Sequence, residues 1–440
     1  MQTTTTQPGH TPIDPGAAYR FRRSDILLFI LAAAGLLSAA LLGSPAASPR
    51  PWPEGSWLQP IVWLLSLGCR LPTLRGIELK SLLVAVVSGL LLAGATIRMI
   101  RRRIQLLDDW QGFAGNTAEP TNAATLSVWG ALLLIVWGWA SAFWSADAAI
   151  AFGSVWVFSL GYIWAAGLAL HGHRQVVRPL ADVLLTTAAV AAALSLWYWK
   201  VRSADARLGW PMGNPLLLAS VMLPAVVVGA GRLAERFDSL RRTGWQARDL
   251  LWLCLTALAI GLAVAALLAT GSRGPLLALL AGLAVAAWTS MTRTTRIAWT
   301  LVGLVIVALA APTVAQRIFS ASGGRDASAR MRLYAWRDAL DLAWQKPAAG
   351  AGAGGFALQA THLSVADTIA DPLAMGGQVS SHAHCEPLEI LADLGIFGLL
   401  MLLAIWAFAL IAAVTRARGD DRWLAAGIAG AIVGVLIDAS

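Results

Sequence analysis

An arginine between two apolar stretches is the residue of this sequence with the most direct chemical meaning. Arg273 lies in the segment TGSRGP (270–275), which leaves almost no loop between the flanking apolar runs. At the centre of a membrane helix an arginine costs about 2.5–3.5 kcal/mol, and it costs less at a helix end. The side chain can reach lipid headgroups, or it can face a cavity and bind phosphate oxygens in pairs. In the second case Gly271 and Gly274 would let a ligand approach the backbone.

A second arginine, Arg207, lies in a polar loop that ends where another apolar run begins at Asn214. A helix that starts there would carry a partial positive charge at its N-terminus, on the same side as Arg207. An ordinary solvated loop arginine is an equally good interpretation of Arg207 alone. Taken together with Arg273, it indicates a site for an anion.

Two histidines in the segment SHAHCEPLE (381–389) are candidates for proton transfer. The ordinary pKa of a histidine, about 6.5, suits a general base around neutral pH. His382 and His384 could also suggest a metal site, but no third ligand stands at a convincing spacing, and Glu386 or Glu389 could only assist. A loop histidine with purely local hydrogen bonds is the remaining alternative.

The composition places these residues in a membrane protein. Of 440 residues, 58% are hydrophobic and 13% are charged, whereas a soluble globular chain has about 25% charged residues. Runs such as LLFILAAAGLLSAALLG do not alternate polar and apolar residues as the strands of a membrane barrel do. The predicted fold class is therefore an all-α polytopic membrane protein. The net charge of +9 lies in clusters between the runs, which indicates membrane topology rather than nucleic-acid binding.

Eleven apolar runs predict transmembrane helices of the length that the hydrocarbon core requires. If the spans alternate, the basic clusters between them all lie on the cytoplasmic side, as the positive-inside rule demands. A short run at 56–71 is expected to be re-entrant or interfacial, because a crossing there would place Arg101–Arg103 outside. With eleven spans the chain would end outside, so we expect that this run crosses or that a final helix follows Ser440. The expected spans lie near 24–43, 80–98, 124–144, 149–170, 176–199, 214–231, 250–269, 275–291, 297–312, 393–414 and 422–438.

A long periplasmic loop interrupts the pattern of spans. Its apolar residues recur at helical spacing and predict an amphipathic helix over 328–344, which a run of glycines from Gly350 ends. These apolar residues are Leu333, Trp336, Leu340 and Trp344. A second helix is expected near Pro387 and continues into the next span. The predicted parts of the chain are a cytoplasmic tail (1–23), transmembrane helices with short loops (24–312), the periplasmic loop (313–392) and C-terminal transmembrane helices (393–440).

The sequence from Arg207 to Gly398 resembles the O-antigen ligase family of membrane glycosyltransferases. The resemblance rests on the order, spacing and shared side of four motifs, none of which is specific alone. His384 aligns with the family's histidine, but this chain has Cys385 where the family usually has asparagine. The motif residues are Arg207, Gly209, Asn214 and Pro215; Ser272, Arg273 and Gly274; Arg332, Trp336, Pro347, Gly350, Gly352, Gly354 and Phe356; and His384, Gly395 and Gly398.

The resemblance implies a GT-C-like enzyme of the bacterial inner membrane with its active site facing the periplasm. A glycan carried on undecaprenyl pyrophosphate would be transferred to a sugar hydroxyl of lipid A–core, with inversion at the anomeric carbon. Arg273 and Arg207 would stabilise the leaving diphosphate, and His384 would take the proton of the attacking hydroxyl. The arginines would make a metal or other cofactor unnecessary. The expected partners are these two substrates and membrane lipids.

Five further residues are expected to bind the substrates, and the helix over 328–344 would lie over the cavity that holds them. They are Arg332, His382, Trp336, Asn214 and Ser272. Three alternatives stay open. An O-antigen polymerase or a protein O-oligosaccharyltransferase would use the same donor, whereas a lipid-glycan transporter would need broken helices and charges at mid-membrane.

Overall fold

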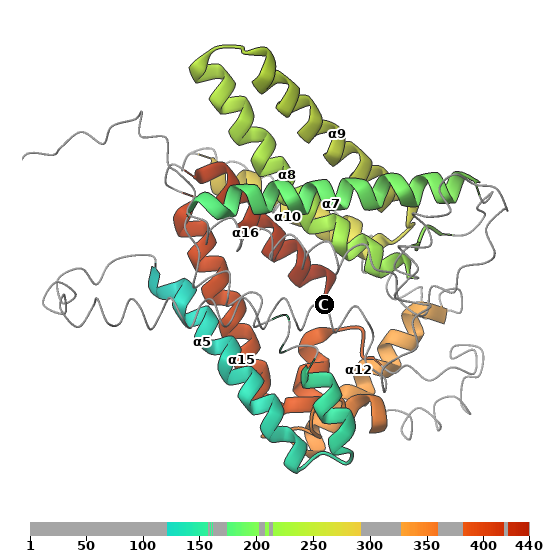
Figure 1. Ribbon diagram of the computed structural model, residues 1–440. Coiled ribbons are helices and arrows are strands. Elements are labelled where there is room, and N and C mark those ends of the chain that lie inside the picture. The colour runs from blue at the N-terminus through green and yellow to red at the C-terminus, as the bar shows by residue number, and fades with distance from the viewer. Residues whose placement is uncertain are drawn as a thin grey trace, which may run out of the picture.

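The computed structural model describes residues 121–156, 159, 161, 174–201, 207–210, 214–291, 327–359, 382–417 and 421–439. The regular structure in these ranges is helical (Figure 1). The helices are α5 (Thr121–Ala140), the 3-10 helix η2 (Ser141–Phe143), α7 (Arg174–Val201), α8 (Pro215–Thr243), α9 (Ala247–Ala269), α10 (Arg273–Ser290), α12 (Ala327–Gln345), α15 (Glu386–Arg416) and α16 (Arg422–Asp438). Residues 148–156 are also helical.

Six of the described helices are long and apolar enough to cross a membrane, which confirms the predicted all-α polytopic fold. They are α5 with η2, α7, α8, α9, α10 and α15, and each overlaps a predicted span. α16 occupies the predicted span 422–438. The tail 1–23, the run 56–71 and the spans near 24–43, 80–98 and 297–312 lie outside the described residues, as does much of 149–170.

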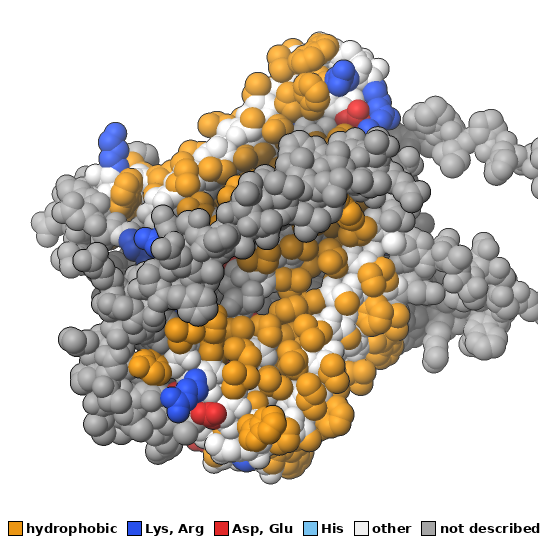
Figure 2. Space-filling view, turned by 180° about the vertical axis from the view of Figure 1, so that it is seen from behind, with side chains coloured by type: hydrophobic (Ala, Val, Ile, Leu, Met, Phe, Trp, Pro, Cys, Tyr) orange, Lys and Arg blue, Asp and Glu red, His pale blue; other side chains and the backbone are white. Residues whose placement is uncertain are grey.

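The surface of these helices suits lipid rather than water. Large apolar side chains point outward, among them Leu258 on α9, Leu280 on α10 and Leu400 on α15. Figure 2 shows hydrophobic side chains over most of the described part of the visible face, with charged side chains gathered in a few places. In water such a continuous apolar surface would aggregate, whereas in a bilayer it contacts acyl chains.

Two helices extend well beyond the predicted spans. α8 was expected over 214–231 but continues to Thr243, because its charged last third is held by ion pairs. Its 29 residues are roughly 43 Å long, more than the ~30 Å of the hydrocarbon core. α15 begins at Glu386, which confirms the helix expected near Pro387, and it joins the following span across a kink at Gly395.

Glycines let α16 pack against the backbone of α10. A Cβ on Gly430 would lie 2.2 Å from the carbonyl oxygen of Gly282, and one on Gly434 would lie 3.1 Å from that of Ala278. Because residue 430 faces 282 and residue 434 faces 278, the two helices are antiparallel. The C-terminal end of α16 therefore lies where α10 begins.

The same stripe of small residues brings α16 against α8. A Cβ on Gly231 of α8 would lie 2.5 Å from the carbonyl oxygen of Trp423, and near the other end of α16 the Ser220 hydroxyl donates to Asp438. The buried core of this group consists mainly of α7, α8, α9 and α10 side chains of modest size. Since lipid gives helices no hydrophobic reason to associate, such close backbone contact is what holds them together.

α5 lies along α15 and forms a second packing unit. The Ser127 hydroxyl donates to the carbonyl of Ile405 at 3.1 Å, and the Trp137 indole donates to the carbonyl of Leu394 at 3.0 Å. Leu394 stands at the kink of α15, where a backbone carbonyl loses its helical partner. The indole therefore satisfies a carbonyl that the kink leaves open.

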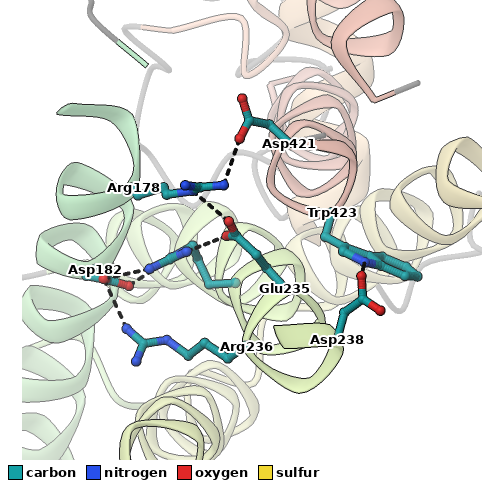
Figure 3. Close-up of polar contacts among 8 residues, drawn as sticks. Arg178, Asp182, Glu235, Arg236, Asp238, Asp421 and Trp423 are labelled. Atoms are coloured by element: carbon teal, nitrogen blue, oxygen red, sulfur yellow. Dashed lines mark hydrogen bonds and ion pairs between the residues drawn. The ribbon is translucent and has the colours of Figure 1, made fainter. Parts of the chain in front are cut away.

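An ion-pair network closes the opposite end of the α8 group, where α8 ends and α16 begins (Figure 3). Arg232, buried in α8, binds Asp182 of α7 at 2.8 Å and Glu235 one turn on. Arg178 of α7 binds Glu235 at 2.6 Å and Asp421, just before α16, at 2.8 Å. Arg178 and Arg232 belong to two basic clusters predicted to share the cytoplasmic side of the membrane, and the structure brings them together at one end.

The glycine packing predicts a selective loss of stability. Gly430→Ala would press a methyl group against the α10 backbone and lower the free energy of unfolding by about 1–3 kcal/mol. Gly261→Ala in α9 is the matched control, because a Cβ there meets no atom within 4 Å. Thermal unfolding in lipid nanodiscs should show a Tm lower by several degrees for the first variant only. Equal Tm values would contradict the close approach.

The ion-pair network predicts a contrast between two arginines of α8. Arg232→Met leaves Asp182 and Glu235 without their buried partner, which typically costs about 3–5 kcal/mol. Arg242→Met breaks only an exposed pair with Asp238, which is worth about 0–1 kcal/mol. Denaturant unfolding in detergent micelles compares the two variants. A similar, small loss in both would mean that water screens the whole network.

Candidate active site

The structure brings the loop of Arg207 onto the hairpin that carries Arg273. The Arg207 guanidinium donates from Nε to the carbonyl of Thr270 at 2.8 Å and from Nη2 to the Ser272 hydroxyl at 2.7 Å. The backbone N–H of Leu208 also donates to the carbonyl of Ala269 at 3.2 Å. Two segments more than 60 residues apart, each singled out in the sequence for its arginine, therefore meet at the start of α10.

Gly271 lies beside the Arg207 side chain. It takes a φ of +62°, which a glycine adopts readily, and a Cβ there would lie 3.5 Å from Nε of Arg207. The Arg207 side chain therefore lies beside Gly271 at ordinary contact distance, and the approach of a ligand to this glycine stays a prediction. At Gly274 a Cβ would meet nothing within 4 Å.

Arg273 is the first residue of α10, and its side chain is exposed. Among the residues that the structure describes it has no ion-pair or hydrogen-bond partner. Ser272 precedes the helix, but its hydroxyl makes no capping bond to the first turn, since it accepts from Arg207 instead. The N–H groups at the start of α10 thus add their partial positive charge beside the two guanidinium groups.

α7 holds the other side of the Arg207 loop. The Ser195 hydroxyl donates to the carbonyl of Trp210 at 2.7 Å, and the Trp210 ring stacks on Tyr198 with centroids 5.0 Å apart. Asn214, the last residue before α8, accepts a hydrogen bond from the N–H of Leu216 at 2.8 Å. It caps the helix as an N-terminal asparagine commonly does, so its side chain already has a structural partner.

The two candidate histidines differ sharply in their partners. His382 lies with Nδ1 3.0 Å from Glu389, whose second oxygen accepts the N–H of Ala383 at 3.0 Å. This carboxylate raises the pKa of His382. For His384, partial burial of the ring, the Arg332 guanidinium and His382 lower the pKa. His384 is therefore neutral over a wider pH range than His382, as a proton acceptor must be.

The backbone at His384 is unusual. Its φ of +54° lies in the left-handed region, where few residues other than glycine are found. Such a conformation costs on the order of 1–3 kcal/mol and persists only where the surroundings impose it. Here the turn at 382–384 is imposed by the two bonds to Glu389.

Sequence reasoning missed one acidic residue at this end of the molecule, Asp438. It accepts a hydrogen bond from Ser220 of α8 and interacts electrostatically with Arg332. The next residue, Ala439, accepts the N–H of Glu386 at 2.7 Å, which ties α16 to the start of α15. A carboxylate at the end of an otherwise apolar span can indicate a functional residue. In the sequence alone, however, Asp438 marks only the end of a span.

The helix that carries Arg332 and Trp336 forms as predicted, but it buries a different face. α12 packs through Ala335, Ala339 and Leu342, whereas the expected stripe is outside, with Leu333 55%, Leu340 51% and Trp344 87% exposed. Alanines allow a close approach to the start of α15, which the larger side chains would prevent. Trp336 is half-buried, and its indole N–H is buried without a hydrogen-bond partner among the described residues.

The described residues contain no group of three or more His, Cys, Asp or Glu that could hold a metal ion. The metal-free mechanism stays a prediction.

The contrast between the histidines is testable by NMR titration of histidine-labelled protein in nanodiscs. His384 should titrate below 6.5 and His382 above it. Arg332→Gln should raise the midpoint of His384, because the cation that disfavours its protonated form is gone. Arg337→Gln, a matched change on the exposed face of α12, should leave it in place. A midpoint for His384 above that of His382 would contradict the geometry.

Comparison with known proteins gives one match. No curated protein matches the chain, but residues 258–403 match the family model of the O-antigen ligase. This range contains the second half of α9, the Arg273 hairpin, α10, α12, His384 and the first part of α15. Three of the four motifs lie within this range, and the motif of the Arg207 loop precedes it. This match supports the resemblance to the O-antigen ligase family that the motifs indicated.

Proposed function

We propose that this protein is an O-antigen ligase that moves a glycan from undecaprenyl pyrophosphate to a sugar hydroxyl of lipid A–core. The match of residues 258–403 to the family model supports a ligase-type or polymerase-type membrane transferase in general. The donor, the acceptor, the periplasmic position of the site and the residue roles are our proposal. The observation that carries it is the seating of Arg207 on the hairpin of Arg273.

The positive charge of this hairpin remains available to a ligand. Arg207 binds a backbone carbonyl and a hydroxyl, neither of which neutralises a guanidinium. This is the opposite of Arg232, which two carboxylates surround. Arg207 uses two of the five N–H donors of a guanidinium on the protein and keeps the rest. Together with Arg273 and the start of α10, it suits a diphosphate whose charge grows as it leaves.

His384 supplies the base in this proposal. Its neutral imidazole accepts the proton of the attacking sugar hydroxyl while that oxygen bonds to the anomeric carbon. The bond from the anomeric carbon to the phosphate oxygen breaks on the opposite face, and undecaprenyl pyrophosphate leaves with the bonding electrons. The configuration is inverted. Arg332 favours the neutral form of His384 before the reaction.

The chain connections around α16 support a shared site for these residues. α16 ends where α8 and α10 begin, and its last turns contact the start of α15 just after His384. The arginines and the histidine thus belong to one end of the bundle, and the balanced ion pairs belong to the other. A transporter would instead require charged groups midway along its spans, so this distribution favours a transferase.

Reconstitution into proteoliposomes tests the proposal. Purified undecaprenyl-linked glycan is supplied with either lipid A–core or further lipid-linked glycan, and lengthening of the lipid A–core indicates a ligase. Arg273→Ala should lose on the order of 10²–10³-fold in kcat, as when one charge-stabilising donor is removed. Arg337→Ala, an exposed α12 arginine, should keep wild-type activity.

The opposing results are equally clear. Growth of the lipid-linked glycan alone would identify a polymerase and overturn the ligase assignment. Full transfer by Arg273→Ala would overturn the diphosphate role of the hairpin. Loss of transfer with a chelator, reversed by a divalent cation, would overturn the metal-free mechanism.

A further inference from the structure

The first segment of α15 carries two carboxylates one helical turn apart, Glu389 and Asp393. A kink at Gly395, with φ of +69° and ψ of −169°, separates this segment from the membrane-spanning remainder of α15. The side chains point to different partners. Glu389 binds the turn that precedes α15, and Asp393 binds the glycine-rich loop that follows α12.

Asp393 is buried, with 8% of its surface exposed. Its two carboxylate oxygens accept the backbone N–H groups of Gly354 and Phe356, each at 2.7 Å. A carboxylate is the one side chain that accepts at both ends without offering a proton. The loop that it holds comes directly after α12, so Asp393 fixes the helix that carries Arg332.

Backbone contacts add to this attachment and explain the glycines of the motif. The N–H groups of Ala351 and Gly352 donate to the carbonyls of Ala392 and Asp393, at 2.9 and 2.8 Å. A Cβ on Gly350 would lie 2.3 Å from the Asp393 carbonyl oxygen. These glycines therefore allow two backbones to approach closely, and the loop packs directly against α15.

The end of α5 and η2 also hold this loop through hydrogen bonds. The Trp144 indole donates to the carbonyl of Ala349 at 3.1 Å, and the Ser141 hydroxyl accepts the N–H of Ala353 at 2.9 Å. The loop is thus held on one side by α15 and on the other by the end of α5. Its position leaves little freedom for α12.

Glu389 holds the turn that carries His384, as Asp393 holds the loop next to the helix that carries Arg332. Its oxygens contact His382 and the N–H of Ala383, which are the residues immediately before His384. These bonds shape the turn in which His384 adopts its positive φ. One short helical segment therefore holds both sides of the site through two carboxylates.

We propose that Glu389 and Asp393 are positioning residues that set the separation between the His384 imidazole and the Arg332 guanidinium. Neither acid needs to touch a substrate. A catalytic role for His384 and Arg332 rests on the proposed function. The positioning of these two side chains does not. A charge interaction falls with distance, and a misplacement of about 1 Å can cost on the order of 10²-fold in rate.

Asp393→Asn is the discriminating variant, because asparagine keeps the shape of the side chain. Its amide nitrogen would face one of the two backbone N–H groups that the carboxylate now accepts, so the loop should detach and α12 should shift. NMR titration of histidine-labelled full-length protein in nanodiscs should then show the pKa of His384 rising toward 6.5. Glycan transfer should fall by about 10–100-fold in kcat, with a smaller change in KM.

Glu386→Gln is the matched control for charge. Among the described residues, the charged groups that act on His384 are Arg332, His382 and Glu389. Asp393 acts on it only through His382, whose pKa both Glu386 and Asp393 raise. The control removes that indirect effect without touching the loop. An equal midpoint of His384 in the two variants would overturn the proposal.

A second variant keeps the test informative if Asp393→Asn does not fold. Ser141→Ala loosens the same loop at Ala353 without changing any charge, and it should move the His384 midpoint in the same direction by less. An unchanged midpoint in Ser141→Ala would then count against positioning. Because titration does not require turnover, a wild-type protein that transfers no glycan would refute the proposed function and leave this measurement valid.

Discussion

The packing of α16 against α8 and α10 is the constraint on which the rest of this structure depends. In a bilayer apolar side chains gain nothing by leaving lipid for one another, so helices associate through close contact and polar bonds. Gly430 and Gly282 supply that contact, since neither position has room for a Cβ. Only with the backbones this close does Asp438 reach Ser220 of α8. The contact also brings Ala439 to the start of α15, directly after His384.

Arginine is used in opposite ways at the two ends of the bundle. Arg232 is enclosed by carboxylates from two helices, so its charge is spent on holding α7 against α8. Arg207 is held by two hydrogen bonds, to a carbonyl and a hydroxyl, so its charge is retained. The difference lies in the acceptors and not in the arginine. A fixed but uncompensated cation is what an anionic ligand requires, and the structure meets this requirement at one end only among the described residues.

The sequence predicted most of the described helices and singled out the loops of Arg207 and Arg273. It did so because apolar runs and the polar or glycine-rich residues that end them are local properties. The start of α8 after Asn214, the hairpin before α10 and the ends of α12 all follow from a few neighbouring residues. The buried face of α12 did not, because alanines at a helix interface give a weaker periodic signal than exposed leucines and tryptophans. The roles of Glu389, Asp393 and Asp438 depend on partners distant in the chain, which no local pattern contains.

The arrangement around His384 answers two demands that oppose each other. A nearby cation keeps the imidazole neutral and able to accept a proton, but it also disfavours the imidazolium that proton transfer creates. If Arg332 lay much closer, His384 would be a poor base, and if it lay far away, His384 would be partly protonated before reaction. The useful separation is therefore a narrow one, which flexible loops could not maintain. A turn held by one carboxylate and a helix held by another, both on the same short segment of α15, give that separation a rigid reference. This is a physical reason why this part of the chain combines glycines, which let two backbones approach closely, with Glu389 and Asp393, which hold the segments in place.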